Sequence, residues 1–459
     1  MAKAPAELLA SLRQRLGDRL DTRPDILALH GKDESYHPPA PPDAVAFATS
    51  TEEVQEVVRL CRHHRTPLIP FGTGTSLEGG VMAIHGGISV DLSAMNRILR
   101  VSGDDLDCTV EAGVTRKQLN HHLRDTGLFF PIDPGADASL GGMASTRASG
   151  TNAVRYGTMR EAVLGLTAVL ADGSVIKTGG RARKSAAGYD LTRLLVGAEG
   201  TLGIITELTL RLHGLPEAMA AAVCPYPTLK AAVDTVIQVI QSCIPIARVE
   251  LLDALQMEAV NRWANFDYPV APTLFFEFHG SEAGVAEQAR EVEAIAAEHC
   301  AGAFQWTSRD QERNALWAAR HAAYYAALAL VPGCKGWPTD VCVPISRLAD
   351  CIEATQADLA ADGLTAPLVG HVGDGNFHLL YLVDPDDAAQ LERIKANNDR
   401  LVHRALAMGG TCSGEHGVGY GKMEFLEAEH GAIAVATMAA IKRALDPDNL
   451  LNPGKMVMV

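Results

Sequence analysis

The sequence lacks any apolar run long enough to cross a bilayer. Its longest uncharged, mostly apolar stretches, at 322–331 and 432–441, are about ten residues each, whereas a membrane-spanning helix needs about 20. Residues 1–25 contain no apolar core of the kind that a signal peptide requires. We therefore expect a cytoplasmic protein with no transmembrane segment, with peripheral attachment at the inner membrane as the alternative.

Clustered cysteines and a basic stripe are missing as well. The nine cysteines are scattered, and none forms C-x-x-C or C-x-x-C-H, so iron–sulfur, zinc-knuckle and c-type haem sites have no local support. Lys and Arg number 40 against 55 Asp and Glu, which gives a formal charge of −15. A nucleic-acid partner needs a positive footprint, so we expect no such partner.

Glycine, in contrast, is concentrated in one part of the chain. Of the 42 glycines, 23 lie within residues 72–214, where short strand-like segments such as 107–111 and 204–212 alternate with loops. Ahead of this stretch we expect a strand at 44–47 and a helix at 51–64, capped by Thr51. The glycines indicate loops in which backbone, rather than side chains, has a task.

The composition changes near residue 216, where glycine becomes sparse. Strands then alternate with amphipathic helices, which indicates an antiparallel sheet with helices, and one long helix is expected over 309–331. A chain of 459 residues suits more than one domain. We predict an α+β protein with one domain over 1–215, completed by 409–459, and a second domain over 216–408.

The segment PFGTGTSLEGG at 70–80 follows an expected strand, and its glycines permit turns that direct backbone N–H groups at an anion. It is not a Rossmann fingerprint, because Leu77 stands where the third glycine is needed. The later segment 417–422 is not a Walker A loop, because His416 stands where the first glycine is needed. On its own, the first loop fits a ligand-free glycine-rich turn equally well.

Three further segments, 134–145, 150–152 and 197–206, follow in order, and DPDNLLNPGK lies at 446–455. Together with the first loop they resemble the vanillyl-alcohol oxidase/p-cresol methylhydroxylase flavoprotein superfamily, and more narrowly its D-2-hydroxy-acid dehydrogenase branch, over essentially the whole chain. The resemblance implies a two-lobed FAD-binding domain and an antiparallel-sheet substrate cap with helices. Because no histidine lies between Pro70 and Gly80, we expect the FAD to be noncovalent.

The resemblance also implies which residues contact FAD. The first loop would hold the pyrophosphate through its backbone, with hydroxyl donors from Thr75 and Ser76, and the later segments would line the other sides. The implied FAD-binding residues are Pro70, Gly72, Thr73, Gly74, Thr75, Ser76, Gly79, Pro134, Gly135, Ser139, Gly142, Ser145, Gly150, Asn152, Glu199, Gly200, Ile205 and Asn452.

A histidine hairpin is the second candidate site. In the stretch 368–380, Asp374-Gly375 predicts a two-residue type I′ turn that sets His371 opposite His378. Directly opposed Cβ atoms are about 4.5–5.5 Å apart, so both imidazoles could reach one metal ion. Glu415 is a candidate third ligand, since two histidines and a carboxylate suit a catalytic metal. Judged on the residues alone, an ordinary polar hairpin is the more common explanation.

The resemblance favours the metal: it implies that this histidine pair and Glu415 hold a divalent ion, with His416 as general base. Nitrogen and oxygen ligands suit zinc, manganese and iron alike. Arg320 and Lys335 match the family's anchors for the substrate carboxylate. The implied reaction is the FAD- and metal-dependent oxidation of D-lactate or a related D-2-hydroxy acid to the 2-oxo acid, with hydride transfer to flavin N5.

The resemblance also bears on partners and alternatives. An external electron acceptor is implied, such as cytochrome c, an electron-transfer flavoprotein or quinone, and a homodimer is allowed for. The alternatives are a subunit of a glycolate-oxidising complex, a D-2-hydroxyglutarate dehydrogenase, an alkylglycerone-phosphate synthase and a nucleotide binder without activity. Tyr324, where the hydroxyglutarate enzymes carry threonine, and TDVCVP at 339–344 favour a small substrate.

Overall fold

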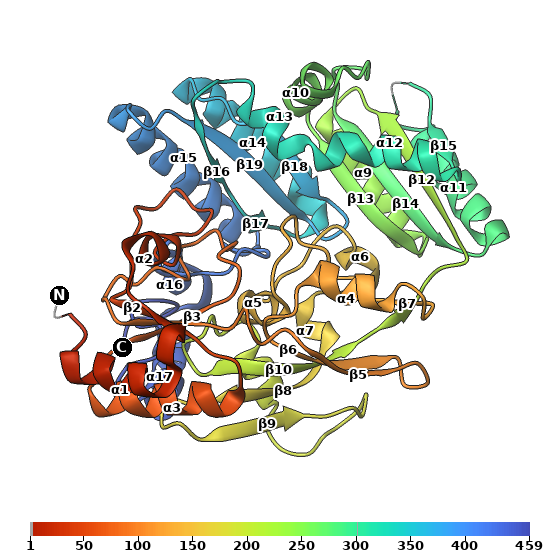
Figure 1. The fold of residues 1–459 in the computed structure, drawn as a ribbon. Helices are drawn as coiled ribbons and strands as arrows, with labels where there is room; N and C mark the ends of the chain where they lie inside the picture. The colour runs from red at the N-terminus through yellow and green to blue at the C-terminus, as the bar shows by residue number, and fades with distance from the viewer. Residues whose placement is uncertain (1–2, 301) are drawn as a thin grey trace. The chain divides into compact units, whose positions relative to one another are not determined.

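The computed structural model describes residues 3–300 and 302–459, which divide into two compact units (Figure 1). The first unit includes the chain up to Ser149, Gly157–Leu215 and Glu415–Val459, and the second includes Gly150–Tyr156 and Pro216–Gly414. The crossing after residue 215 lies where the change in composition predicts it. The return lies six residues after the predicted 408, and 150–156, expected in the first domain, groups with the second unit.

The strands of the first unit form three sheets. One is four-stranded, in the order β1-β2-β4-β3, another is five-stranded and antiparallel, in the order β5-β6-β10-β8-β9, and β11 pairs with β7. Within the four-stranded sheet, β2 and β3 run parallel to β4. The bounds are β1 Leu20–Asp21, β2 Ala44–Phe47, β3 Leu68–Phe71, β4 Ile88–Asp91, β5 Ile98–Ser102, β6 Asp107–Glu111, β7 Leu128–Phe129, β8 Val163–Val169, β9 Val175–Gly179, β10 Ile204–Arg211 and β11 His213–Gly214.

The helices of the first unit are mostly short. The hydroxyl of Ser50 accepts a hydrogen bond from the Glu53 N–H (3.3 Å), so Ser50, and not Thr51 as expected, caps the helix that starts at residue 51. The bounds are α1 Ala6–Leu16, η1 Gly17–Arg19, α2 Pro24–Leu29, α3 Thr51–His63, α4 Arg116–Leu123, α5 Leu140–Thr146, α7 Met159–Ala162, α8 Leu191–Leu195, η2 Met423–Phe425, α16 Leu426–His430 and α17 Ala432–Leu445.

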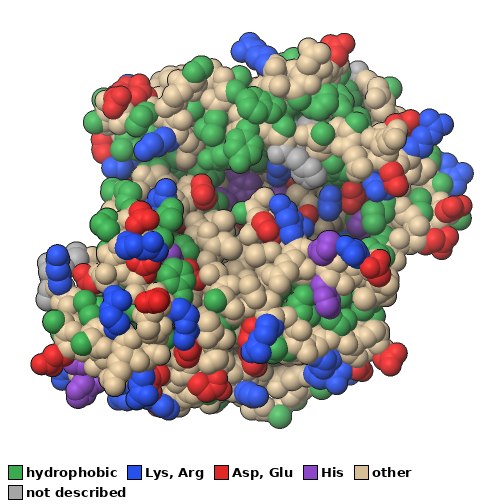
Figure 2. All heavy atoms as spheres, in the orientation of Figure 1, with side chains coloured by type: hydrophobic (Ala, Val, Ile, Leu, Met, Phe, Trp, Pro, Cys, Tyr) green, Lys and Arg blue, Asp and Glu red, His purple; other side chains and the backbone are tan. Residues whose placement is uncertain are grey.

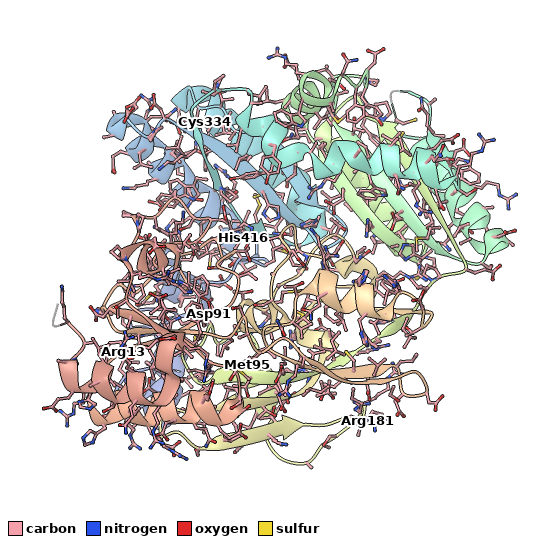
Figure 3. The ribbon with its side chains drawn as sticks, viewed as in Figure 1. Arg13, Asp91, Met95, Arg181, Cys334 and His416 are labelled. Atoms are coloured by element: carbon pink, nitrogen blue, oxygen red, sulfur yellow. The ribbon has the colours of Figure 1, made fainter. Side chains whose placement is uncertain are left out.

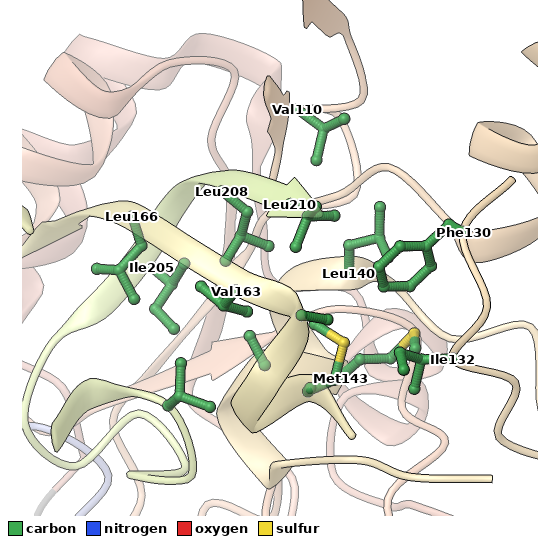
Figure 4. Close-up of a cluster of buried hydrophobic side chains, with 14 of the residues drawn as sticks. Val110, Phe130, Ile132, Leu140, Met143, Val163, Leu166, Ile205, Leu208 and Leu210 are labelled. Atoms are coloured by element: carbon green, nitrogen blue, oxygen red, sulfur yellow. The ribbon is translucent and has the colours of Figure 1, made fainter. Parts of the chain in front are cut away.

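Apolar side chains from sheet and helices make the core of the first unit. Val163, Leu208 and Leu210 of the five-stranded sheet are fully buried against Leu140 and Met143 of α5 (Figure 4). Burying a side chain of this size contributes about 1.5–3 kcal/mol. This packing fixes α5, and therefore the loop that precedes it, against the sheet.

The second unit is built on one eight-stranded sheet. The strand order is β15-β12-β14-β13-β18-β19-β16, with β17 paired to β19, and every pairing is antiparallel, as predicted. The bounds are β12 Ala218–Pro225, β13 Ile246–Leu252, β14 Thr273–Gly280, β15 Gln305–Thr307, β16 Lys335–Pro338, β17 Val341–Cys342, β18 Leu368–His371 and β19 Asn376–Val383.

Helices pack on this sheet. Leu252 and Phe275 contribute to a buried cluster with Trp317 and with residues from the helices that start at Ala254 and Ala323. The single helix expected over 309–331 is wrong, because the chain forms two helices that meet at Ala322. The bounds are α6 Ala153–Tyr156, α9 Leu229–Gln241, α10 Ala254–Ala264, α11 Glu282–Ala296, α12 Asp310–His321, α13 Ala323–Leu328, α14 Ile345–Asp362 and α15 Ala388–Ala407.

The surface carries charged side chains of both signs, as the composition of the sequence indicates. On the face drawn in Figure 2, basic and acidic side chains are interspersed, and the described residues show no continuous basic stripe there. Within the described ranges, no helix has the length and apolar character needed to span a bilayer.

Candidate active site

The first glycine loop and the loop before α5 meet within the first unit. A Cβ added to Gly72 would collide with the Ser139 hydroxyl, so only glycine allows this approach. Ser139 caps α5, because its hydroxyl accepts from the Gly142 N–H (3.3 Å). The loop that is expected to hold the pyrophosphate therefore lies beside the segment that is expected to line another side of the FAD, and backbone N–H groups are the donors that a phosphate needs.

Asp33, which the sequence reading did not single out, shapes the first loop. Its Oδ2 accepts from the Ser76 hydroxyl (2.9 Å) and from the Gly79 N–H (2.9 Å). The hydroxyl hydrogen of Ser76 is thus directed at Asp33 and not at a phosphate, in contrast to the role expected for it. Gly79 has φ of 74°, and a Cβ there would collide with the Tyr420 ring.

The C-terminal segment joins these loops to the segment around residue 199. The Asn452 side-chain amide donates to the Gly80 carbonyl (2.9 Å) and to the Glu199 carbonyl (2.8 Å). Lys455, 2% exposed, donates to the Asn452 side-chain oxygen (2.5 Å) and to the Met82 carbonyl (2.8 Å). Residues separated by more than 370 positions in the sequence therefore form one cradle.

Glu199 is buried in the same region. Its carboxylate accepts from the backbone N–H groups of Val418 (2.6 Å) and Gly419 (2.8 Å). Burial raises the pKa of Glu199 to about 7, although these two hydrogen bonds act in the opposite direction. Gly200, with φ of 72°, lies against the Pro70 ring.

The other residues that were predicted to bind FAD lie in loops, in the core of the first unit and in the second unit. Thr73 and Thr75 hydrogen-bond to each other (3.1 Å), and Ser145 donates to the Gly141 carbonyl (2.8 Å). Ile205 is a buried core residue of β10. Gly150 and Asn152 belong to the second unit, where Asn152 accepts from Arg248 Nε (2.8 Å). Gly74, Pro134 and Gly135 lie in the loops themselves.

The histidine hairpin exists, but its predicted register is wrong. His371 pairs with Asn376 and Val369 pairs with His378, so four residues, 372–375, form the loop. A type I′ turn needs positive φ at both central positions, and of Asp374 and Gly375 only the glycine has it. A shift of two residues keeps both histidines on the same face, and their ring centroids lie 5.3 Å apart.

Each histidine is held through Nδ1. His371 Nδ1 lies 2.7 Å from Glu250 Oε1, and His378 Nδ1 lies 2.8 Å from the Thr339 carbonyl oxygen. Since both oxygens accept hydrogen bonds, Nδ1 of each ring is the donor, and Nε2 is the nitrogen that would face a metal ion. This is the arrangement that metal-binding histidines adopt, with the second ring nitrogen oriented by a carboxylate or carbonyl.

Glu250 binds a second partner, Arg320. Arg320 Nε donates to Glu250 Oε2 at 2.7 Å, and Glu250 is 0% exposed. Burial opposes ionisation of Glu250, but His371 and Arg320 outweigh burial and lower its pKa below the usual value. The sequence reading missed Glu250, although a lone acidic residue within the apolar strand RVELL is the kind of buried charge that needs an explanation.

Asp340 fixes the other side of the hairpin. It accepts from the Asn376 amide (2.9 Å) and from the Ser413 hydroxyl (3.0 Å), and its Oδ1 lies 3.8 Å from His378 Nδ1. The chain passes into the first unit directly after Gly414. Glu415, the expected third ligand, is thus two residues from the anchored Ser413.

His416, labelled in Figure 3, follows in the first unit. Its Nδ1 lies 3.7 Å from Glu78 Oε1, and Lys422 Nζ lies 2.9 Å from the same oxygen. The predicted base therefore lies next to a carboxylate that also pairs with a lysine.

Lys335 lies apart from the residues around Glu250. It pairs with Val383 at the far end of β19 and its side chain is exposed. Val383 is five positions from His378 along β19, about 16 Å of extended chain. Glu250 thus joins Arg320 to His371, whose ring lies beside that of His378, and Lys335 lies outside this group.

A second histidine–carboxylate–arginine cluster lies on the same sheet face. Glu277 Oε1 is 2.8 Å from His279 Nε2 and 3.5 Å from Arg248 Nε. The other nitrogen of His279, Nδ1, is 2.8 Å from the Tyr156 hydroxyl. Both ring nitrogens of His279 are therefore used within the protein, so this cluster does not suit a metal.

The residues present fit both a flavin nucleotide and a metal ion. Glycine at positions 72 and 79 lets the first loop pack closely against Ser139 and Tyr420, and a glycine-rich loop of this kind can direct backbone N–H groups at a phosphate. The second unit offers two imidazoles, each oriented through Nδ1, beside the partly buried Arg320, and imidazole nitrogens suit zinc, manganese and iron alike.

Comparison with known proteins agrees with this description. Residues 42–179 match the family described as FAD binding domain, and residues 215–456 match FAD linked oxidases, C-terminal domain. The chain is 53% identical over 458 residues to "Probable D-lactate dehydrogenase, mitochondrial" of Danio rerio (99% of this chain, 92% of that protein). It is 46% identical over 457 residues to "D-lactate dehydrogenase [cytochrome], mitochondrial" of Arabidopsis thaliana (99% and 81%).

A solved structure shows the same fold. The crystal structure of p-cresol methylhydroxylase with substrate bound superposes with a TM-score of 0.80 at 18% identity, and covers 98% of this chain and 96% of that chain. The predicted fold class, an FAD-binding domain of the vanillyl-alcohol oxidase/p-cresol methylhydroxylase type with an antiparallel cap, is confirmed.

Proposed function

Because this chain belongs to the FAD-linked oxidase family that includes the D-lactate dehydrogenases, we propose that it oxidises D-lactate, or a closely related D-2-hydroxy acid, to the 2-oxo acid. The observation that carries the proposal is the Glu250 carboxylate, which holds His371 through Nδ1 and Arg320 through Nε. This arrangement supplies a metal-binding imidazole and an anchor for a carboxylate side by side, and a 2-hydroxy acid needs both.

FAD would be held by the loops around Gly72, Ser139 and Glu199 together with Asn452, and when bound it supplies the two-electron acceptor. A divalent ion would be held by His371, His378 and Glu415. When bound, the ion lowers the pKa of the substrate hydroxyl, as metals do for water.

The chain's own residues then perform the remaining tasks. Arg320 binds the substrate carboxylate through its terminal Nη groups, because its Nε is engaged by Glu250. His416 accepts the hydroxyl proton at an imidazole nitrogen, which suits a group that titrates near neutral pH. Glu78 stabilises the imidazolium that results.

The placement of Lys335 favours a small monocarboxylate over a dicarboxylate such as 2-hydroxyglutarate. Arg320 is the cation that Glu250 holds next to the histidines, whereas Lys335 is separated from His378 by most of β19. We therefore leave Lys335 out of the proposed anchor.

We propose that electrons leave the flavin for an external acceptor, with a cytochrome as the first candidate because one relative's name specifies it. Both relatives are named as mitochondrial proteins, so these names do not support the expected cytoplasmic location, which stays a prediction. The noncovalent attachment of FAD and a homodimeric state likewise remain to be tested.

Anaerobic bleaching of the flavin tests the proposal. The purified holoprotein is mixed with the D and L enantiomers of lactate, 2-hydroxybutyrate and 2-hydroxyglutarate, and absorbance is followed. We expect rapid bleaching by D-lactate and none by L-lactate. Bleaching by L-lactate alone contradicts the proposal, and bleaching by D-2-hydroxyglutarate alone replaces the substrate.

A second measurement tests the alternative that this chain is a subunit of a glycolate-oxidising complex. We expect the isolated chain, purified by size exclusion, to turn over D-lactate with an artificial electron acceptor. Loss of turnover from a chain that still bleaches would favour the glycolate-oxidising complex.

A further inference from the structure

Glu250 lies between two elements that carry different parts of the proposed site. Strand β13 places it directly across from His371 of β18, given the neighbouring pair Leu251 and Gly370. On its other side is Arg320 of α12. One fully buried carboxylate thus contacts residues 70 positions and 121 positions away in the sequence.

The position of Glu250 between His371 and Arg320 is important because of the chemistry of a 2-hydroxy acid. Its hydroxyl and carboxylate are on adjacent carbons, so a metal that binds the hydroxyl and an arginine that binds the carboxylate must keep a fixed separation. The hairpin and α12 are separate elements, and a displacement of about 1 Å between reacting groups can cost about 100-fold in rate.

We propose that Glu250 is a positioning residue that sets the spacing between the metal-binding His371 and the substrate anchor Arg320, and thereby selects acids with the hydroxyl next to the carboxylate. The proposal rests on the proposed function. Glu250 does not itself touch substrate in this account, because both of its oxygens are occupied by the two protein groups.

The two hydrogen bonds orient their partners in a specific way. His371 is held through Nδ1, which directs Nε2 away from Glu250. Arg320 is held through Nε, which leaves the four hydrogens of its Nη groups for a carboxylate. Each bond therefore presents the edge of its partner that the reaction uses.

A glutamine cannot do the same. His371 Nδ1–H and Arg320 Nε–H are both donors, whereas a side-chain amide has one acceptor oxygen and one donor NH2 group. Glu250→Gln can satisfy one partner and must set a donor against the other. Glu250→Asp keeps both acceptor oxygens but withdraws them by one methylene.

Glu277 offers a matched control on the neighbouring strand. It is equally buried, at 4% exposed, and also contacts a histidine and an arginine. Glu277→Gln disturbs the same kind of cluster on the same sheet face, but the proposed site does not include that cluster.

The test measures metal affinity as well as activity. Co²⁺ and Zn²⁺ binding to the FAD-loaded, metal-free protein is measured by calorimetry, and the Co²⁺ visible spectrum is recorded. For Glu250→Gln we expect metal affinity to fall about 10–100-fold, the range for a lost carboxylate partner of a metal-binding histidine. At saturating metal we expect the KM for D-lactate to rise at least about tenfold. Glu277→Gln is expected to change either value by less than about twofold.

Selectivity gives the second readout. D-3-hydroxybutyrate, whose hydroxyl is one carbon further from the carboxylate, is compared with D-2-hydroxybutyrate. We expect Glu250→Asp to lose part of the preference for the 2-hydroxy acid while the melting temperature changes little, so a poorly folding Glu250→Gln does not leave the question open.

The outcomes separate the two proposals. Unchanged metal affinity, KM and selectivity in both Glu250 variants would overturn the positioning role, and so would equal losses in Glu277→Gln. If wild-type flavin is not bleached by any D-2-hydroxy acid but Glu250→Gln alone weakens metal binding, the proposed substrate fails and the orientation of His371 stands.

Discussion

Glu250 and Glu277 make an internal comparison, because each is a buried carboxylate on the same face of the eight-stranded sheet and each holds a histidine and an arginine. In the Glu277 cluster the histidine uses both ring nitrogens, one on Glu277 and one on Tyr156. In the Glu250 cluster the carboxylate uses Nδ1 of His371, and the second histidine of the pair is held through Nδ1 by a carbonyl.

This difference shows which features make a cluster of polar side chains a candidate metal site. His279 is two residues from its carboxylate on one strand, and its second bond fastens Tyr156 of α6 to the sheet. His371 is 121 residues from Glu250 and belongs to a hairpin that presents two imidazoles on one face. Both clusters satisfy buried charges, but among the described residues of the two clusters only the second sets two imidazoles, each held through Nδ1, on one face of the sheet.

The largest effect expected from this comparison is on metal binding. His371→Ala removes one of the two imidazole ligands, so we expect affinity for Zn²⁺ or Co²⁺ to fall by at least about 100-fold and bleaching by D-lactate to be lost while FAD stays bound. His279→Ala is the control, with metal affinity within about twofold of wild type. Calorimetry on both variants measures this, and equal losses would show that the two clusters do not differ in kind.

The two arginines give the next largest effect. Arg320→Lys keeps a positive charge but loses the planar fork and the Nε hydrogen that Glu250 holds. We expect the KM for D-lactate to rise about tenfold or more, with a smaller change in kcat. In Arg248→Lys the KM is expected to stay within about twofold, because Arg248 contacts Asn152, Glu277 and Trp317. A larger rise of KM in Arg248→Lys would move the anchor to the other cluster.

The smallest effect concerns stability and its dependence on pH. Burial opposes ionisation of Glu277, but His279 and Arg248 outweigh burial and lower its pKa from 4.5. A lowered pKa in the folded state contributes stability above the unfolded value of about 4.5, and that stability is lost as pH falls toward the folded pKa. Glu277→Gln should therefore unfold about 1–3 kcal/mol more easily at pH 7.

Chemical denaturation at pH 7 and at pH 4 checks this prediction. The difference in the free energy of unfolding between wild type and Glu277→Gln should be smaller at pH 4 than at pH 7. If this difference in unfolding free energy is the same at both pH values, the ionised form of Glu277 does not contribute to the stability of the fold.

Local sequence patterns predicted much of the secondary structure. Strands β2 and β6 have the bounds expected of them, since apolar runs between turn residues are a local signal. Strand β5 was not predicted, because it lies at the edge of its sheet with only partly buried side chains and therefore has no clear alternation. The hairpin was recognised from Asp374-Gly375, but its register depends on backbone angles that the dipeptide alone does not determine.

The candidate site was predictable where a motif marks it and not where distant strands assemble it. Histidines 371 and 378 are conspicuous in the sequence. Glu250 and Asp33 are single acidic residues, and their roles depend on contacts with residues 121 and 43 positions away. The role predicted for Lys335 stays a prediction, and a match to a motif does not specify that this residue pairs with Val383 at the end of β19.

The cradle closed by Asn452 has a consequence for how the protein is made. Its amide joins Gly80 to Glu199, so the contacts of the first glycine loop cannot be completed until Asn452 has left the ribosome. Domains generally fold as units during synthesis, but the segments of this unit lie on both sides of residues 216–414 in the sequence, so its folding must wait until the second unit has been made. Cofactor loading should therefore follow synthesis of Asn452, and translation that stops before Asn452 should yield a chain without flavin.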